Sequence, residues 1–213
     1  MRRPRFIAEQ ARHASGLLGR AIAFIMARET WAHNLRAIEA LSLAPADRVL
    51  DVGCGPGRSI AVLAAQAPQG FVAGVDPSAL MVETAAQRNR ALVRQRKAEI
   101  VLASAAELPF SSASFDKALC VHVLYFWNDL DAAFRELARV LRPDGRLALL
   151  FRTNADAAAV RAFPAEVYRF PSLCDVVAPL EGAGFAVDAR DDLCRDAAAT
   201  PVLLTATKRG RGQ

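Results

Sequence analysis

A chain of 213 residues, of which 53% are hydrophobic, is long enough for one domain with a full core and too apolar for an intrinsically disordered protein. Its formal net charge is +5, with basic residues gathered over 2–5 and 208–211. Such ends are typical of solvated tails, although they can also contact nucleic acid or anionic lipid. The four cysteines show neither CxxC spacing nor a zinc-type cluster, so we expect reduced thiols, no metal site and a cytoplasmic protein.

Residues 1–42 predict helices ahead of the first strand. Apolar residues recur at three- and four-residue spacing over 17–26, which indicates an amphipathic helix, and a second helix is predicted over 30–41. Arginines interrupt the first apolar run, and the run is too short to cross a bilayer, so we expect no transmembrane segment. Three roles stay open for the first helix: packing on the domain, covering a substrate as a lid, or lying on a membrane surface.

The middle of the chain alternates short apolar runs with helical patterns. Strands are predicted over 49–52, 71–75, 100–102, 115–122 and 146–151, and helices over 58–67, 78–95 and 130–141, the last closed by a turn over 142–145. A helix over 172–182 is then followed by two strands, 185–191 and 202–207, with no helix between them. This order predicts a Rossmann-like α/β fold: a seven-stranded, mostly parallel sheet with helices on both faces and one antiparallel strand from a C-terminal hairpin.

The stretch from Val49 to Gly57 reads Val-Leu-Asp-Val-Gly-Cys-Gly-Pro-Gly and leads straight into a helix. A strand, a glycine turn and a helix bring bare backbone to a ligand, typically an adenosine-containing cofactor. Dinucleotide sites favour GxGxxG, but Arg58 stands where the last glycine would be. Asp76 ends the second strand, where a carboxylate can accept hydrogen bonds from both ribose hydroxyls or simply cap a helix. Asp51 lies within the first apolar run and needs a polar or cationic partner.

Four motifs stand in order along the chain. They are 49–57, then Gly-Val-Asp-Pro-Ser over 74–78, then Ala-Ala-Glu-Leu-Pro-Phe over 105–110 with Ser-Phe-Asp at 114–116, and finally Leu-Ala-Arg-Val-Leu-Arg-Pro-Asp-Gly-Arg-Leu over 137–147. Together they resemble the class I S-adenosylmethionine-dependent methyltransferases of the small-molecule type, similar to the quinone-biosynthesis group, over roughly residues 47–151. The resemblance implies S-adenosylmethionine as cofactor, S-adenosylhomocysteine as product, and in-line attack of an acceptor on the sulfonium methyl.

The resemblance also implies which residues hold the cofactor. The turn would approach the methionine part through backbone, Asp51 would hold its ammonium, and Asp76 would take the ribose hydroxyls. Ser104 stands where the family usually has an aspartate that bonds adenine, a departure that bears on affinity. The expected cofactor-binding set is Asp51, Gly53, Cys54, Gly55, Asp76, Pro77, Met81, Ser104, Ala105 and His122.

Methyl transfer requires little catalytic machinery, because alignment of the acceptor and exclusion of water do most of the work. His122, at the end of the fourth strand, has three open interpretations: a contact to the methionine part, a catalytic general base, or a structural histidine. A base is useful only for an acceptor such as a hydroxyl, and His13 and His33 are alternatives. Aromatic residues over 163–170 are expected to face the lid across the substrate, and the expected substrate contacts are His13, Tyr125 and Tyr168.

We therefore expect an N-terminal helical lid (1–42), an S-adenosylmethionine-binding domain (43–208) and a basic tail (209–213). The expected substrate is a small, hydrophobic or lipid-like molecule, and the expected protein is a monomer or homodimer that can contact a membrane peripherally. Methylation of RNA or protein is the first alternative, supported only by the basic tails. A nicotinamide-dependent reductase and a non-catalytic cofactor-binding protein are the others.

Overall fold

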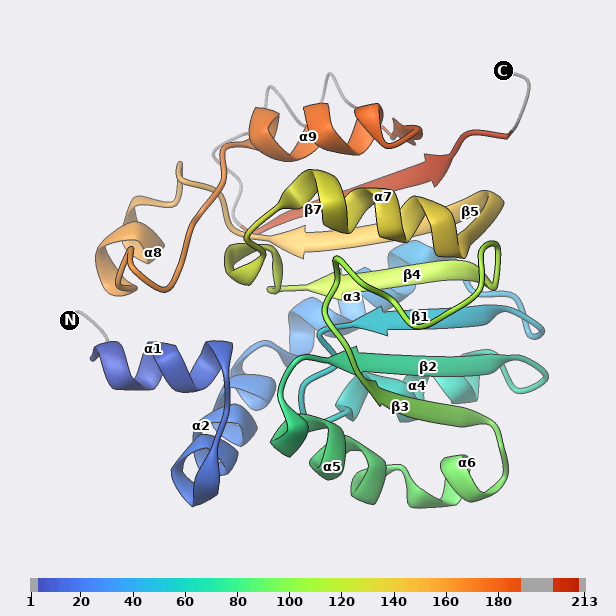
Figure 1. Cartoon of the computed structure of the whole chain (residues 1–213), viewed down its shortest axis with the longest axis horizontal. Helices are drawn as coiled ribbons and strands as arrows, with labels where there is room; N and C mark the ends of the chain where they lie inside the picture. The colour runs from blue at the N-terminus through green and yellow to red at the C-terminus, as the bar shows by residue number, and fades with distance from the viewer. Residues whose placement is uncertain (1–3, 189–200, 211–213) are drawn as a thin grey trace.

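The computed structural model describes residues 4–188 and 201–210. Predictions that fall on 1–3, 189–200 and 211–213, including the end of the strand expected over 185–191 and most of the basic tail, lie outside the described residues. One sheet runs through the molecule in the order β3-β2-β1-β4-β5-β7-β6 (Figure 1). Its strands are β1 (Arg48–Val52), β2 (Phe71–Asp76), β3 (Ala98–Leu102), β4 (Phe115–Val121), β5 (Leu141–Phe151), β6 (Phe185–Val187) and β7 (Val202–Lys208).

The strand directions confirm the predicted sheet. β3, β2, β1, β4 and β5 pair in parallel, whereas β7 pairs antiparallel with both β5 and β6. Because β7 alone reverses, the seven-stranded sheet has the one antiparallel strand that the C-terminal hairpin predicts. This is the Rossmann-like arrangement, in which ligands bind beyond the carboxyl ends of the parallel strands.

Helices cover both faces of the sheet (Figure 1). They are α1 (Arg5–Arg12), α2 (Gly16–Glu29), α3 (Trp31–Leu41), α4 (Arg58–Gln66), α5 (Ala79–Arg88), α6 (Arg90–Arg94), α7 (Leu130–Val140), α8 (Ala157–Ala162) and α9 (Leu173–Gly182). Buried side chains of α3 and α4 form the core of one face, and those of α7 and α9 form the larger core of the other. The helix that the sequence predicts over 30–41 therefore belongs to the domain core, while α1 and α2 lie beside the carboxyl edge of the sheet.

Two predicted elements differ from the structure. The helix expected over 78–95 is divided into α5 and α6 at Asn89, whose side-chain amide donates to the carbonyls of Gly57 and Ala85, each at 2.9 Å. This side chain ties the helix to the glycine turn and interrupts it there. The turn expected over 142–145 lies inside β5, where Asp144 has a φ of 62° and the pairing register with β4 shifts.

None of the helices within residues 4–188 and 201–210 is both long and apolar enough to cross a membrane.

Candidate functional site

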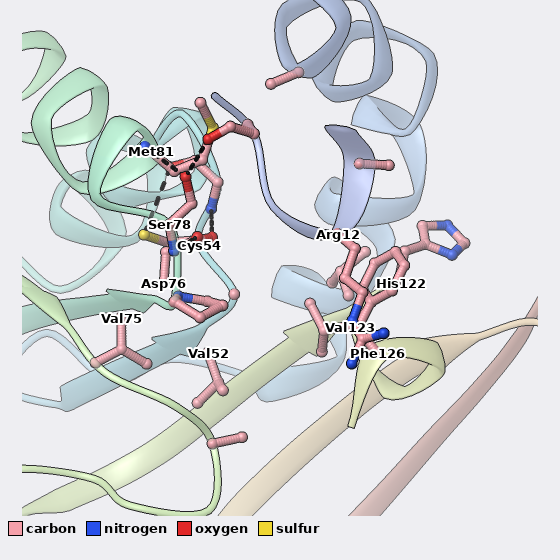
Figure 2. A pocket seen from close by; sticks show the side chains of 18 of the residues that line it. Arg12, Val52, Cys54, Val75, Asp76, Ser78, Met81, His122, Val123 and Phe126 are labelled. Carbon is pink, nitrogen blue, oxygen red and sulfur yellow. Dashed lines mark hydrogen bonds between the residues drawn. The ribbon is translucent and has the colours of Figure 1, made fainter. Parts of the chain in front are cut away.

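A cavity of about 410 Å³ lies at the carboxyl edge of the sheet. We call one side of it the turn wall, formed by residues 52–56 after β1, residues 75–78 and 81 after β2, and residues 103–106 after β3. We call the other side the helix wall, formed by residues 10–14, 23, 26, 27, 30 and 31 of the N-terminal helices and by residues 121–123 and 126–129 at and after the end of β4. Figure 2 shows Cys54, Asp76 and Ser78 of the turn wall on one side, and Arg12, Val123 and Phe126 of the helix wall opposite.

The glycine turn owes its shape to backbone that only glycine adopts easily. Gly53 and Gly55 have φ of 76° and 53°, in the left-handed region that disfavours side chains. The N–H groups of Gly53 and Cys54 both donate to the carbonyl of Val75, at 2.8 and 3.0 Å, which fastens the turn to β2. A Cβ on Gly55 would meet nothing within 4 Å, because this glycine faces the open cavity. The turn therefore offers bare backbone to a ligand.

Asp76 is held rigidly at the floor of the turn wall. Its two carboxylate oxygens accept from the N–H groups of Gly55, at 3.0 Å, and Ser78, at 2.9 Å. Burial raises the pKa of Asp76, and the hydrogen bonds from Ser78 and Gly55, together with nearby His13, oppose that rise. Ser78 caps α5, and its hydroxyl donates to the carbonyl of Ala14 on the helix wall at 2.8 Å. One short segment thus positions a carboxylate and attaches the opposite wall.

Asp51 lies behind the turn wall and does not line the cavity. Its carboxyl group is almost fully buried and accepts a hydrogen bond from the hydroxyl of Ser59, which does line the cavity. Burial raises the pKa of Asp51 to about 7, a rise that the Ser59 hydrogen bond opposes and the charge of Asp76 reinforces. Any influence of Asp51 on a ligand is therefore relayed through Ser59 or the turn.

Two motifs far apart in the sequence meet at the loop after β3. Ser104 and Ala105 line the cavity. The loop is fastened to α7, because Glu136 accepts from the N–H of Leu108 at 2.8 Å and Arg139 donates to the Leu108 carbonyl at 2.8 Å. Glu136 and Arg139 also pair with each other at 2.6 Å. These hydrogen bonds join the segment with the Leu-Pro-Phe motif to the helix with the Leu-Ala-Arg motif, and together they position Ser104 and Ala105.

His122 lines the cavity, but both of its ring nitrogens are engaged. Nδ1 lies 2.8 Å from the Tyr125 hydroxyl, and Nε2 lies 2.9 Å from Nδ1 of His33. The Tyr125 hydroxyl also accepts from the N–H of Arg152 at 2.6 Å, and the tautomer of His122 sets which group donates in its bonds to Tyr125 and His33. Burial, then His33 and Arg152, lower the pKa of His122 to about 3. His122 is therefore neutral near pH 7, and its nitrogens are occupied by Tyr125 and His33.

The structure brings some of the expected substrate residues to the cavity and not others. His13 lines it, whereas neither Tyr125 nor Tyr168 is among the described residues that do. Tyr168 is buried in an aromatic cluster with Phe163 and Phe170, at ring-centroid distances of 4.5 and 5.8 Å. The expected aromatic wall over 163–170 is corrected accordingly, because these rings pack behind the residues after β4. Phe126 and Trp127 occupy that side of the cavity.

Gln10, Arg12 and Arg58 line the cavity, although the sequence pattern assigned none of them a place in the site. Gln10 and Arg12 come from α1, which the sequence pattern did not predict, and Arg12 donates to Asn128 at 3.3 Å. Arg58 donates to the carbonyl of Ala27 at 3.0 Å and lies 4.3 Å from the ring centre of Trp31. The sequence signal for a role of Arg58 at the site was its position directly after the third glycine of the turn. Arg58 therefore links the start of α4 to the N-terminal helices.

The fold and the site define a protein that binds an adenosine-containing cofactor on a Rossmann-like sheet. The comparisons with known proteins narrow this class. Residues 50–149 match the family described as "Methyltransferase domain". Residues 50–149 therefore carry a methyltransferase domain. Together with the named relatives, this match supports a class I S-adenosylmethionine-dependent methyltransferase, a family whose cofactor is S-adenosylmethionine.

Relatives and solved structures agree with this family. The chain is 35% identical over 161 residues to 27-O-demethylrifamycin SV methyltransferase of Amycolatopsis mediterranei, covering 72% of this chain and 59% of that protein. It is 38% identical over 111 residues to O-methyltransferase rstn1 of Aspergillus nomiae, covering 52% and 49%. A solved structure with a similar fold is geranyl diphosphate C-methyltransferase from Streptomyces coelicolor A3(2), in complex with Mg2+, geranyl-S-thiolodiphosphate and S-adenosyl-L-homocysteine. Its TM-score is 0.66 at 17% identity, over 83% of this chain and 75% of that chain, so this likeness is one of fold. The chain spans about half the length of the curated relatives it matches.

Proposed function

We propose that this protein transfers the methyl group of S-adenosylmethionine to a hydroxyl of a small, hydrophobic molecule. The observation that carries the proposal is the cavity itself, in which a wall of glycine backbone and carboxylate faces a wall of apolar and aromatic side chains. The names of the curated relatives, an O-methyltransferase and a 27-O-demethylrifamycin SV methyltransferase, support an oxygen acceptor.

The turn wall has the groups that this cofactor needs. Asp76 accepts the ribose hydroxyls, Gly53 and Gly55 approach the methionine part, and Asp51 acts on its ammonium through Ser59. Pro77 and Met81 flank the adenine, with Ser104 and Ala105 at its edge. When bound, S-adenosylmethionine supplies a methyl group already activated by the sulfonium. The remaining task of the protein is alignment and exclusion of water.

The helix wall faces the acceptor. Met26, Trp31, Phe126 and Trp127 give it apolar and aromatic surface, which favours burial of a hydrophobic acceptor. α1 and α2 close over this side, held by the hydrogen bonds to Ala14 and Ala27. The helices therefore act as a lid whose inner surface contacts the acceptor.

The catalytic role expected for His122 becomes a positioning role in this proposal. Its nitrogens are bonded to Tyr125 and His33, and its low pKa makes it a weak base. His13 lines the cavity and has no side-chain hydrogen bond within the described part of the chain, so it can accept the acceptor's proton, directly or through water. Orientation of the acceptor by the lid then contributes more than general-base catalysis.

A paired binding and turnover experiment tests the proposal. In calorimetric titration, Asp76→Ala should weaken S-adenosylmethionine binding by about 1–3 kcal/mol, because two ribose hydrogen bonds are lost. Asp131→Ala, which removes an exposed carboxylate from the start of α7, is the control and should bind like the wild type. Turnover is measured as S-adenosylhomocysteine release and as the mass gain of hydroxylated hydrophobic acceptors.

Three outcomes would contradict the proposal. Tighter binding of NAD(H) than of S-adenosylmethionine would indicate a reductase. Cofactor binding without methylation of any acceptor would indicate a non-catalytic protein, and methylation of RNA with a salt-sensitive gel shift would indicate a nucleic-acid substrate.

A further inference from the structure

Exposed apolar side chains are concentrated on the N-terminal helices. Of the eight large hydrophobic side chains that are exposed within the described residues, five lie on α1 and α2, and the other three are scattered over α3, β3 and α8. Four of the five are on α2, where Leu17 is 85% exposed and Leu18, Phe24 and Ile25 are each more than half exposed. Exposed apolar groups gathered in this way mark a surface that contacts something else.

These side chains form one continuous stripe. Leu17, Leu18, Ala21, Phe24 and Ile25 follow the three- and four-residue spacing of one helix face, and all five are exposed. We call this face the outer stripe. The opposite face of α2 contains buried Ile22 and the cavity-lining residues Ala23, Met26 and Ala27. Packing on the domain therefore explains one apolar face of α2 and leaves the outer stripe unexplained.

The charge around the outer stripe is positive. Arg28 continues the stripe at the C-terminal end of α2, and Arg20 lies along its edge. Neither has a carboxylate within 4.0 Å among the described residues. The guanidinium of Arg88 lies 6.0 Å from the ring centre of Phe24 and adds a third positive charge beside the stripe. The one acidic residue of α2 is Glu29, at its last position.

We propose that the outer stripe of α2 docks on an anionic lipid bilayer, with α2 lying in the plane of the interface. The 14-residue helix is too short to cross the bilayer but long enough to bury one face at the level of the headgroups. Leu17, Phe24 and Ile25 enter the acyl boundary, while Arg20 and Arg28 extend toward lipid phosphates.

The same charges argue against a second copy of this chain as the occupant. Pairing two outer stripes around a two-fold axis would bring the arginines of both copies into one apolar interface without carboxylates of the stripe to pair with them. An anionic bilayer supplies the opposite charge along the whole helix. The inference goes beyond the proposed function and does not depend on it.

Vesicle co-sedimentation of the full chain tests this inference. Vesicles of equal parts phosphatidylglycerol and phosphatidylcholine are compared with vesicles of phosphatidylcholine alone. We expect binding to the anionic vesicles, weakened by salt. Phe24→Glu with Ile25→Glu should lower the partition coefficient at least about tenfold, because two buried apolar side chains are replaced by charges. Arg20→Gln with Arg28→Gln should lower it about tenfold or more on anionic vesicles only, at about 1 kcal/mol per arginine.

The control variant is Val160→Glu, which places the same charge on an exposed apolar position of α8 and should bind vesicles like the wild type. Circular dichroism verifies that each variant is folded. The inference is overturned if the wild type does not bind the anionic vesicles, or if the Phe24 and Ile25 variant binds as well as the wild type. It is also overturned if sedimentation equilibrium shows a wild-type dimer that this variant dissociates while vesicle binding is absent.

Discussion

The two walls of the cavity are built by different means. The turn wall is fixed by backbone: the N–H groups of Gly53 and Cys54 share one carbonyl acceptor on β2, and Asp76 is bonded by backbone at both oxygens. The N-terminal helices of the helix wall are attached through side chains, by the bonds from Ser78 to Ala14, from Arg58 to Ala27 and from Arg12 to Asn128. Backbone bonds within a buried sheet open only with the fold, whereas a few side-chain bonds can open locally.

This difference assigns different tasks to the two walls. A cofactor common to a whole family can be held by a rigid surface that does not need to change. An acceptor that must enter and leave needs a wall that can move away from the sheet. The predictions below test this division, because each changes one wall and measures what happens to both.

Gly53→Ala should have the largest effect on the turn wall. The added Cβ would lie 2.2 Å from Cγ1 of Val123, at a φ of 76° that disfavours a side chain. We expect a loss of about 2–5 kcal/mol in the free energy of unfolding, from left-handed strain and overpacking together, and a parallel loss of S-adenosylmethionine affinity. Urea unfolding and calorimetric titration measure the two effects.

Gly182→Ala is the matched control for this prediction. A Cβ at Gly182 would meet nothing within 4 Å, and this glycine ends α9 far from the turn in the sequence. Its free energy of unfolding should change by less than about 1 kcal/mol, in the stabilising direction. If Gly53→Ala is as stable as the wild type and still binds the cofactor, the turn wall is not rigid.

Deletion of residues 1–28 should act on the helix wall alone. It removes α1 and most of α2 but leaves α3, whose buried residues belong to the domain core. We expect turnover to fall about 100-fold or more, because the acceptor loses its orientation and its shield from water. Cofactor binding should persist, since the turn wall is untouched. Full activity of the truncated protein would contradict the assignment of α1 and α2 as a lid.

The contrast between the walls also explains what the sequence predicts and what it does not. The turn wall was predictable because its residues are local: a strand, a glycine turn and an acid at the next strand end each carry a short-range pattern. Topology then fixes their proximity, since the carboxyl ends of parallel strands share one edge. Whether each of these residues contacts the cofactor stays a prediction that the binding variants test.

The helix wall was less predictable because its residues come together only through tertiary packing. α1 is only eight residues long and has a single buried residue, Ala8, so its apolar positions are too few to indicate a helix from spacing alone. Tyr168 lies in the segment that was expected to face the substrate, but its ring packs among other rings. No local sequence pattern distinguishes a ring in such a cluster from a ring that lines a cavity. The break at Asn89 depends on Gly57, a distant residue in the sequence.

His122→Gln should change how the free energy of unfolding depends on pH. The pKa of His122 is about 3 in the folded protein and 6.5 in the unfolded chain, so the unfolded state binds a proton that the folded state does not. The contribution of His122 to stability should therefore fall as pH decreases from 6.5 toward 3, by up to about 1.4 kcal/mol per pH unit for one proton, whereas Asp51 and Asp76, whose pKa values burial raises, oppose that fall. Measured by urea unfolding across this range, stability should fall less, or rise more, with decreasing pH in His122→Gln than in the wild type.

Neighbouring groups set the control for that measurement. His33 contributes in the same direction, because burial and nearby Arg152 and Arg36 lower its pKa as well. Asp51 and Asp76 contribute in the opposite direction in both proteins, so the difference between the two slopes, and not the slope of either protein, isolates His122. Equal slopes in the wild type and His122→Gln would show that His122 is accessible to protons in the folded protein.

Ser104→Asp should have the smallest effect and should improve the turn wall. It restores the acidic residue that the family usually has at the adenine edge, in a loop already held by Glu136 and Arg139. A carboxylate accepts a stronger hydrogen bond than a hydroxyl, so S-adenosylmethionine should bind tighter by about 0.5–1.5 kcal/mol. Ser112→Asp places the same charge on an exposed position nearby and should leave the affinity unchanged. Because the helix wall is not altered, turnover at saturating cofactor should stay the same.

An unchanged affinity in Ser104→Asp would mean that this side chain does not face the adenine. A changed turnover would mean that the two walls do not act separately.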